Sequence, residues 1–336
     1  MGYRAEKLAI EEKIKRIKRV VLFIVVGIVM SLCIFSAFIP AETWKYHVAK
    51  PKISKRLDGE LRLHFLNVGQ GDCSLIEFPD GKIMLVDGGD ASSKTEKTIL
   101  RYLNALKIEK IDYLLLTHSD VDHCGSLDKV VKYKKIGKVY IPKVLEDINT
   151  QYAEFYTELI EKGCSTSFTS KSITISSDRA DCPYTLSFLY PYTSDVNTMD
   201  KLTENTNAYS SVFWLDYFGA SALFAGDAPT NPVEEKLITA DKLSLNAESV
   251  CLTSTEILKV AHHGSEDSSS NEFLQYLNVE TAVISCAKDN PYGHPSENLC
   301  ERLEKNGIKD YRTYQDGHII ITIDKMGDYK VDCIAF

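Results

Sequence analysis

A run of twenty residues without a charge, from Val20 to Ile39, constrains this chain more than any other feature of its sequence (VVLFIVVGIVMSLCIFSAFI). About twenty apolar residues are what a helix needs to cross the hydrocarbon core of a membrane. A helix in the core of a soluble domain would interrupt such a run with polar positions. We therefore predict a transmembrane anchor at residues 20–39, after a basic N-terminal arm at residues 1–19.

The charges that flank this run predict its orientation. Residues 13–19 read KIKRIKR, and an excess of Lys and Arg marks the cytoplasmic side of a membrane helix. Five basic residues between 45 and 56 weaken this bias. We expect a single-pass protein of the cell membrane whose C-terminal part lies outside the cytoplasm. A cleaved signal peptide is the alternative, but the run is longer than the apolar region of such peptides and no A-x-A cleavage site follows it.

The formal net charge of −8 is divided unevenly along the chain. Residues 1–60 carry a balance of +6, and the remainder carries −14. The basic part fits an arm beside a membrane, and the rest forms a strongly acidic body. Such a body would repel nucleic acid unless bound cations or a local basic patch offset its charge.

The nine cysteines contain no C-x-x-C pair, which argues against a structural zinc site. Eight of them lie outside the anchor, and several fall in apolar, strand-like text. A domain of this size does not need disulfides for its stability. We interpret these residues as buried free thiols, with disulfides as the alternative.

The polar, Lys-rich stretch at 40–60 is typical of a linker, and one domain is expected at 61–336. Short apolar runs alternate there with amphipathic ones. The patterns predict helices near 94–106, 152–161, 232–240, 270–277 and 296–305. They predict strands at runs that include 212–218, 220–227, 256–263, 281–286 and 318–324. This alternation favours sheets packed together with helices outside.

The densest group of metal-ligand side chains comes directly after the apolar run DYLLLT. It consists of His118, Asp120, Asp122 and His123. With these spacings, the four side chains cannot share one face of a helix, and they cannot share one face of a strand either. A loop that curls around an ion can make all four converge. Imidazole and carboxylate together suit zinc, manganese or iron, so we predict a metal-binding loop.

Further short motifs accompany T-H-S-D-V-D-H-C-G (117–125). They are L-N-V-G-Q-G-D (66–72), M-L-V-D-G-G (84–89), N-A-Y-S-S-V (207–212), L-F-A-G-D (223–227), L-K-V-A-H-H-G-S (258–265) and Y-G-H-P (292–295). Together they resemble the metallo-β-lactamase superfamily, in the form where Asp replaces the middle His of the ligand motif. Within it they look like the corresponding domain of ComEC-type competence proteins, which take up DNA. The resemblance covers roughly residues 61–324. It implies a mixed α/β fold, the αββα sandwich, here preceded by one transmembrane helix.

The resemblance also implies the ligands of two metal ions. His118 and Asp120 would bind one ion, and Asp122 and His123 would bind the other. Asp227 would be the carboxylate that bridges them; a helix cap is the alternative role for this residue.

The same resemblance implies roles for three further histidines. His262 is expected to be a further ligand, while His263 faces the opposite side or the substrate. His294 would be a ligand or a group that contacts substrate, and a surface histidine is the alternative. Which of the three is the last metal ligand stays open.

The remaining site residues would shape the centre rather than bind metal. Asp87 would accept a hydrogen bond from a ligand histidine and so orient the metal loop. Asp72, Asn207 and Ser210 belong to motifs that form the walls of the site. Cys73 and Ser126 depart from the family pattern, but neither departure removes a ligand.

The resemblance implies a hydrolase with two divalent metal ions, zinc or manganese. Three carboxylates make the site harder than one built from imidazoles alone and move its preference toward manganese. Two ions that share a water favour hydrolysis, with Asp122, Asp227, His263 and His294 as catalytic residues. The expected substrate is a phosphodiester, DNA included. The alternatives are another ester or amide (a cell-wall phosphodiester, a lactone, a β-lactam) and a non-catalytic, metal-stabilised binding module.

Overall fold

The computed structural model describes residues 2–39, 41–143, 149–192, 206–242 and 250–335. The chain forms two compact units, Met1–Ala49 and Lys50–Phe336. Residues 54–62 of the second unit are tied to its sheets, because the Arg62 guanidinium donates to the Ser54 carbonyl at 2.7 Å and the Tyr217 hydroxyl donates to the Gly59 carbonyl. The C-terminal part of the expected linker therefore lies with the domain.

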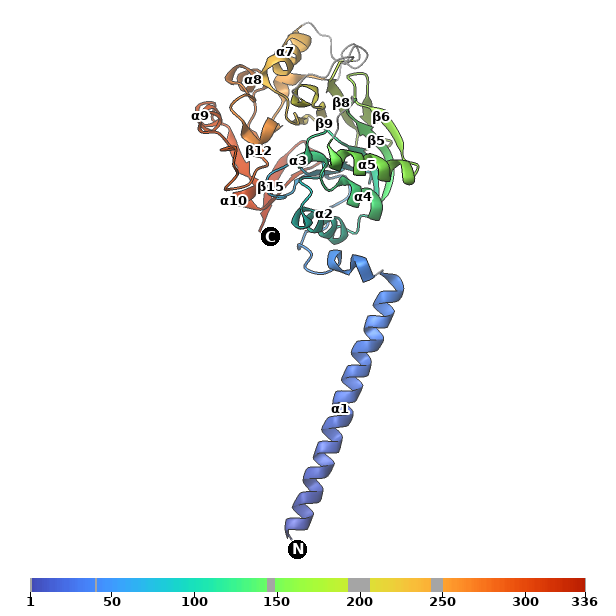
Figure 1. The fold of residues 1–336 in the computed structure, drawn as a ribbon. Coiled ribbons are helices and arrows are strands. Elements are labelled where there is room, and N and C mark those ends of the chain that lie inside the picture. The colour runs from blue at the N-terminus through green and yellow to red at the C-terminus, as the bar shows by residue number, and fades with distance from the viewer. Residues whose placement is uncertain (1, 40, 144–148, 193–205, 243–249, 336) are drawn as a thin grey trace. The chain divides into compact units, whose positions relative to one another are not determined.

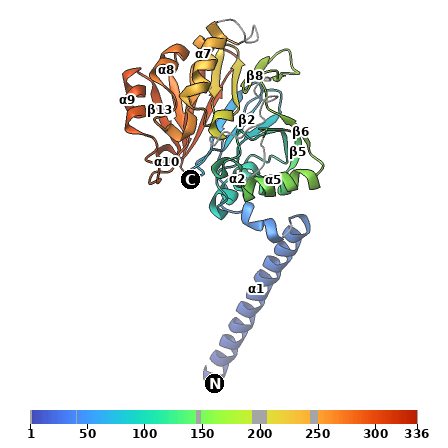
Figure 2. The same cartoon turned by 45° about the horizontal axis from the view of Figure 1, so that its top comes forward.

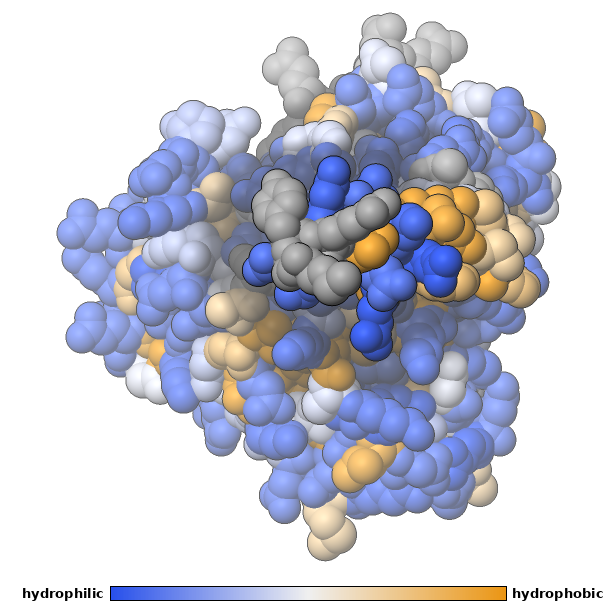
Figure 3. All heavy atoms as spheres, turned by 90° about the horizontal axis from the view of Figure 1, so that it is seen from below, coloured by the Kyte–Doolittle hydropathy of each residue, from blue (hydrophilic) through white to orange (hydrophobic). Residues whose placement is uncertain are grey.

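The first unit contains the long helix α1 (Gly2–Phe38) and the short 3₁₀-helix η1 (Ala41–Tyr46). In its most apolar stretch α1 has a mean hydropathy of 2.9, and none of that stretch is buried. Figure 3 looks toward its N-terminal end, where hydrophilic side chains give way to the hydrophobic ones that follow along the helix. Among the described residues, α1 is the one helix long and apolar enough to cross a membrane.

The second unit is built on two sheets. The first has eight strands, in the order β15 (Tyr329–Ile334), β14 (His318–Ile323), β1 (Leu61–Phe65), β2 (Ser74–Glu77), β3 (Ile83–Val86), β4 (Lys110–Leu115), β5 (Lys135–Ile141), β6 (Ser165–Phe168). The second has seven, in the order β13 (Lys309–Arg312), β12 (Thr281–Ile284), β11 (Ile257–Lys259), β10 (Ala220–Phe224), β9 (Val212–Tyr217), β8 (Tyr184–Tyr190), β7 (Thr174–Ser176). Strands β3 to β6 are parallel to one another, and so are β10 to β13.

Helices cover the outer faces of both sheets (Figures 1 and 2). On the side of the first sheet lie α2 (Ser93–Ala105), α3 (Val121–Cys124), α4 (Leu127–Tyr133) and α5 (Thr150–Glu161). On the side of the second lie α7 (Glu235–Lys242), α8 (Asn271–Leu277), α9 (Glu297–Lys305) and α10 (Thr313–Asp316). The five helices expected from periodicity all form, and the two-sheet arrangement with helices outside confirms the expected fold.

The main core lies between the sheets, and both sheets supply its aromatic side chains. The Phe224 ring on β10 stacks on Phe213 of β9 at 4.6 Å and on Phe65 of β1 at 5.6 Å between ring centroids. All three rings are fully buried. A second core lies between the second sheet and its helices and contains Leu258, Phe273 and other apolar residues. These two cores fix the strand ends that carry the candidate site.

Candidate metal centre

The candidate metal centre lies where parallel strands of both sheets end. Asp87 follows β3, the loop His118–His123 follows β4, Asp227 comes after β10, and His262 and His263 come after β11. The carboxyl ends of parallel strands meet at one edge of a sheet, which is where α/β proteins commonly bind ligands. Polar residues at these ends therefore become neighbours although they are far apart in the chain.

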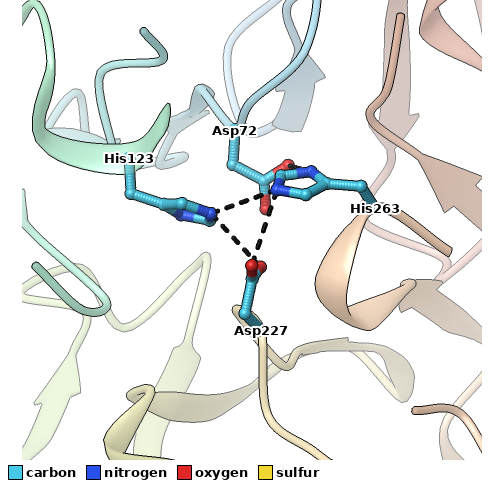
Figure 4. A group of neighbouring side chains, drawn as sticks. All are labelled: Asp72, His123, Asp227 and His263. Atoms are coloured by element: carbon cyan, nitrogen blue, oxygen red, sulfur yellow. Dashed lines mark hydrogen bonds and ion pairs between the residues drawn. The ribbon is translucent and has the colours of Figure 1, made fainter. Parts of the chain in front are cut away.

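Four buried side chains converge at the centre of this region (Figure 4). Asp72, His123, Asp227 and His263 each offer one ligand atom, and these atoms all lie within 4.8 Å of one another. The four residues come from four separate segments of the chain, two associated with each sheet. Such a meeting of imidazoles and carboxylates is the donor set that zinc and manganese take.

One group of ligand atoms surrounds Asp227 on the side of His118. The Nε2 atom of His118 lies 3.7 Å from Oδ2 of Asp120 and 3.8 Å from Oδ2 of Asp227. The Nε2 atom of His262 lies 3.9 Å from the same Asp227 oxygen. His118 is fully buried, yet its Nε2 has no hydrogen-bond partner among the described residues. A bound cation would satisfy that atom.

A second group surrounds Asp227 on the side of His263. The Nε2 atom of His263 lies 3.1 Å from Oδ2 of Asp122, 3.3 Å from Nε2 of His123 and 3.5 Å from Oδ2 of Asp227. The Nε2 atom of His123 lies 3.2 Å from Oδ1 of Asp227. The Asp227 carboxylate is therefore shared by the two groups.

The spacing of these atoms fits divalent metal ions. Two nitrogen or oxygen ligands that bind one ion at about 2.1 Å with a tetrahedral angle lie roughly 3.4 Å apart. The atom pairs in both groups are separated by 3.1 to 3.9 Å. The donor set and its geometry thus suit two ions that share one carboxylate.

His123 is oriented by groups beneath it. Its Nδ1 lies 2.9 Å from Oδ2 of Asp87, which also accepts a hydrogen bond from the Thr117 hydroxyl at 2.8 Å. The other Asp87 oxygen accepts from the Thr117 backbone N–H at 2.8 Å. An imidazole that donates to a carboxylate through one nitrogen presents the other nitrogen to the metal, so Asp87 sets the direction of His123 Nε2.

His263 is oriented in a similar way. Its Nδ1 lies 2.9 Å from the Ser285 carbonyl oxygen and 3.4 Å from Oδ1 of Asp72. The other Asp72 oxygen accepts a hydrogen bond from the Lys259 ammonium at 2.7 Å. Asp72 lies close to the ligand atoms, but its Oδ2 is bonded to Lys259, and its Oδ1, which has no hydrogen-bond partner among the described residues, lies nearest to the Nδ1 of His263, on the side of that ring away from the ligand atoms. We therefore read Asp72 as an orienting group.

The backbone turns sharply at the two adjacent histidines. His262 and His263 have φ angles of 50° and 53°, in the left-handed region that side-chain-bearing residues seldom adopt. Such strain persists where the surroundings hold it in place, and it clusters at functional sites. The turn brings both rings to the Asp227 carboxylate, with His263 buried and the His262 side chain 30% exposed. A regular strand would send the two side chains to opposite faces.

The charges of the cluster shift its pKa values strongly. Burial lowers the pKa of His263, but the carboxylates of Asp227 and Asp72 outweigh it and raise that pKa to about 10. Burial raises the pKa of Asp122, but His263 and His123 hold it at about 2. Burial and the neighbouring His123 lower the pKa of His118. Burial lowers the pKa of His123, but Asp227 and Asp87 outweigh it and raise that pKa well above its usual value, so without metal His123 and His263 favour the protonated form and His118 the neutral form.

The remaining expected residues lie around this centre. The amide nitrogen of Asn207 is 3.3 Å from Nε2 of His262, and the Ser210 hydroxyl accepts a hydrogen bond from the Asp227 backbone N–H at 3.1 Å. The His294 ring, which is half-buried, lies 5.4 Å from the His262 ring between centroids. The structure thus brings together all twelve side chains named from the sequence.

Lys259, Thr117 and Ser285 were not singled out from the sequence. Lys259 is only 2% exposed, although it follows two apolar residues in a short strand. A lysine within an apolar strand of a parallel sheet is itself a signal, because such a residue is seldom buried without a paired carboxylate. Thr117 and Ser285 carry no comparable signal, since small hydroxyl residues are common at strand ends.

Comparison with known proteins agrees with this geometry. The family described as "Metallo-beta-lactamase superfamily" matches residues 66–288. The chain is 26% identical to ComE operon protein 3 of Bacillus subtilis (strain 168) over 278 residues, which is 78% of this chain and 33% of that protein. It is 28% identical to competence protein ComA of Neisseria gonorrhoeae over 270 residues, 80% of this chain and 33% of that protein. The chain thus spans about a third of the length of these curated relatives.

Similar solved structures are more distant in sequence. CmlA, a diiron β-hydroxylase from Streptomyces venezuelae, is 14% identical with a TM-score of 0.49, and the alignment covers 81% of this chain and 55% of CmlA.

The family match extends over about two thirds of the chain and includes the whole His118–His123 loop and all of β10 and β11. This chain belongs to the metallo-β-lactamase superfamily, and the relatives it resembles there are ComEC-type competence proteins.

Proposed function

We propose that this protein is a metal-dependent hydrolase of phosphodiesters, with a nucleic acid strand as substrate. One ion is held by His118, Asp120, His262 and Asp227, and the other by Asp122, His123, His263 and Asp227. The observation that carries the proposal is the pair of ligand groups that share the Asp227 carboxylate. The likeness to competence proteins supports nucleic acid as the substrate class.

The chemistry of the site supports hydrolysis. Two divalent ions held by these residues would supply Lewis-acid polarisation of a phosphoryl oxygen and a water nucleophile at neutral pH. The chain contributes three carboxylates: Asp227 is buried, whereas the side chains of Asp120 and Asp122 are 41% and 32% exposed. A phosphodiester would be repelled by these carboxylates alone, so its binding requires the ions. Three carboxylate ligands also favour manganese over zinc.

His294 is the histidine best placed to act on the substrate rather than on a metal. His263 directs its Nε2 toward the ligand atoms and has its other nitrogen engaged by the Ser285 carbonyl. The ring of His294 lies beside His262, at the half-exposed side of the centre, and its Nδ1 has no hydrogen-bond partner among the described residues. His294 can therefore move a proton to or from the leaving oxygen.

The test combines metal analysis with an activity panel. The purified full chain should contain about two divalent ions per molecule and hydrolyse bis(4-nitrophenyl) phosphate and single-stranded DNA with manganese or zinc. We expect His118→Ala and Asp227→Asn to lower kcat by about a thousandfold or more while the fold is retained, because each change removes a ligand. Asp332→Asn on β15 is the matched control, since this exposed carboxylate lies outside the centre.

Three results would contradict the proposal. Wild-type rates in the ligand variants would remove the metal mechanism. Turnover of a lactone or a β-lactam without any phosphodiester turnover would assign the site to another ester or amide. Metal binding with no turnover of any of these substrates would instead indicate a metal-stabilised binding module.

We further propose that residues 20–39 anchor the protein in the cell membrane with residues 61–336 outside the cytoplasm. The support is the apolar stretch of α1, the basic residues before it, and the likeness to ComEC-type proteins. This arrangement would place the acidic domain at the membrane surface where incoming polyanions arrive.

A further inference from the structure

A second polar cavity lies along α2, outside the metal centre. Its volume is about 390 Å³. It is lined by two hydroxyl side chains, one amide and three cations, namely Ser93, Thr98, Asn67, Lys94, Lys97 and Arg101. At about 30 Å³ per water molecule, this space holds roughly a dozen waters, enough for a phosphate with part of its sugar.

The cavity concentrates positive charge on an acidic domain. Lys94, Lys97 and Arg101 are three and four residues apart, so they share one face of the helix. Lys94 and Lys97 form no ion pair in the part of the chain that the structure describes. The residues after 60 carry a net charge of −14, so the three cations around this cavity form a local positive region on a negatively charged domain. The ammonium groups of Lys94 and Lys97, which have no carboxylate partner among the described residues, are donors of the kind that recognise a phosphate.

The cavity lies within a short stretch of chain from the metal centre. Asn67 in its wall and Asp72 in the metal centre are five residues apart, which limits their Cα separation to about 18 Å. The Thr95 hydroxyl of α2 donates to the Val68 carbonyl at 3.0 Å and fixes the helix against this segment. Phosphates of one strand repeat at about 3.4 Å along a duplex axis, so a strand that reaches the metals extends as far as the cavity within a few nucleotides.

We propose that this cavity binds a backbone phosphate of the nucleic acid strand whose phosphodiester lies at the metal centre. The inference rests on the proposed function and adds to it a second contact that holds the strand. Lys94, Lys97 and Arg101 supply charge, while Ser93, Thr98 and Asn67 supply hydrogen bonds. The cavity contributes to affinity and register, and the metals contribute to the chemistry.

The test uses the full chain in dodecyl maltoside, a detergent without phosphate. The triple variant Lys94→Gln, Lys97→Gln, Arg101→Gln is compared with a control triple of equal charge change, Lys135→Gln, Lys305→Gln, Lys330→Gln, at exposed positions elsewhere. Binding of a fluorescein-labelled 20-nucleotide single-stranded DNA is followed by anisotropy, with Asp227→Asn added to each protein so that no strand is cut. Hydrolysis of bis(4-nitrophenyl) phosphate is measured without that change.

We expect the cavity triple to raise the Kd for the oligonucleotide about tenfold, and to lower the slope of log Kd against log salt by about 0.7, since one phosphate contact to a single strand contributes about that amount. Its rate on bis(4-nitrophenyl) phosphate should equal the wild-type rate, because this substrate is too small to reach α2. Equal Kd and equal slope in both triples would overturn the proposal, whatever else the cavity binds.

The same experiment separates this inference from the proposed function. If the wild type cleaves neither substrate but the cavity triple still loses oligonucleotide affinity, the hydrolase proposal fails and the cavity remains a phosphate site. If cleavage is normal and the two triples bind alike, the cavity proposal alone fails.

Discussion

At the scale of single residues, the pair formed by Lys259 and Asp72 explains how His263 is held. The Lys259 ammonium donates to Asp72 at 2.7 Å and to the Val260 carbonyl at 3.0 Å, and both charged side chains are nearly inaccessible to water. Each charge is stable in this position because the other is present. The fixed Asp72 carboxylate then keeps the Nδ1 side of His263 in place.

We predict that Lys259→Met destabilises the metal-free protein by about 3 kcal/mol, because it leaves the Asp72 carboxylate buried without a partner. The double variant Lys259→Met, Asp72→Asn should recover most of this loss, since both charges are removed together. Urea unfolding of the chelator-treated protein measures both values. A single variant within about 0.5 kcal/mol of the wild type would show that the ion pair has no structural role.

The metal loop could be predicted from the sequence and the histidine turn could not. His118, Asp120, Asp122 and His123 lie within six residues of the chain, and this density of ligand-type side chains alone indicated a metal site. His262 and His263 are adjacent, and His263 was expected to face the opposite side or the substrate. Instead, two positive φ angles that no periodicity reveals bring both rings to the Asp227 carboxylate. Asp227 was identified through the family resemblance, because one aspartate at a strand end is equally compatible with a helix cap.

At the scale of elements, apolar patterns located the strands but misjudged where they end. The strand expected at 220–227 ends at Phe224, and the strand expected at 256–263 ends at Lys259. In both cases the chain leaves the sheet before Asp227 or His262 and turns toward the candidate metal centre. The apolar pattern reports burial, and the residues after both strands are buried although they are not extended.

The junction of β1, β14 and α2 carries a buried histidine with a consequence for stability. His318 Nδ1 accepts a hydrogen bond from the Asn67 backbone N–H at 3.0 Å, and its ring packs edge-on against Tyr102 of α2 at 4.9 Å. Burial and the nearby His64 lower the pKa of His318 to about 4. The pKa of His64 is also lowered, mainly by burial. Neutral imidazole is the form that this junction accommodates.

We predict that acid weakens the fold through His318. Between pH 6.5 and 4 the unfolded chain binds a proton here that the folded chain does not, so the free energy of unfolding rises with pH in this window, by up to about 3 kcal/mol across it. His318→Asn preserves an acceptor for Asn67 and removes the titration. Its urea midpoint should fall less than that of the wild type as pH is lowered from 7 to 4. Parallel curves would contradict the assignment.

At the scale of the whole molecule, the charge distribution and the candidate metal centre are related, because bound cations would offset the negative charge of the domain. The anchor arm is basic and the domain carries −14, while the metal centre alone gathers three carboxylates. Cations bound in the centre, together with the basic cavity on α2, would attract a polyanion to this acidic domain. The ligands come from loops of both sheets, so bound ions would also stabilise the packing of one sheet against the other, by about 2.7 kcal/mol at a hundredfold excess over Kd.

The proposed topology predicts which thiols react from outside the cell. All nine cysteines are free; Cys251 and Cys333 are exposed on the domain, whereas Cys73 and Cys182 are buried. A membrane-impermeant maleimide added to intact protoplasts should therefore label the wild-type protein, and Cys251→Ser with Cys333→Ser should remove most of the labelling. The buried thiols should react only after denaturation, which checks the amount of protein. Labelling that appears only after lysis would place the domain in the cytoplasm, and the free thiols would then match the reducing conditions of that compartment.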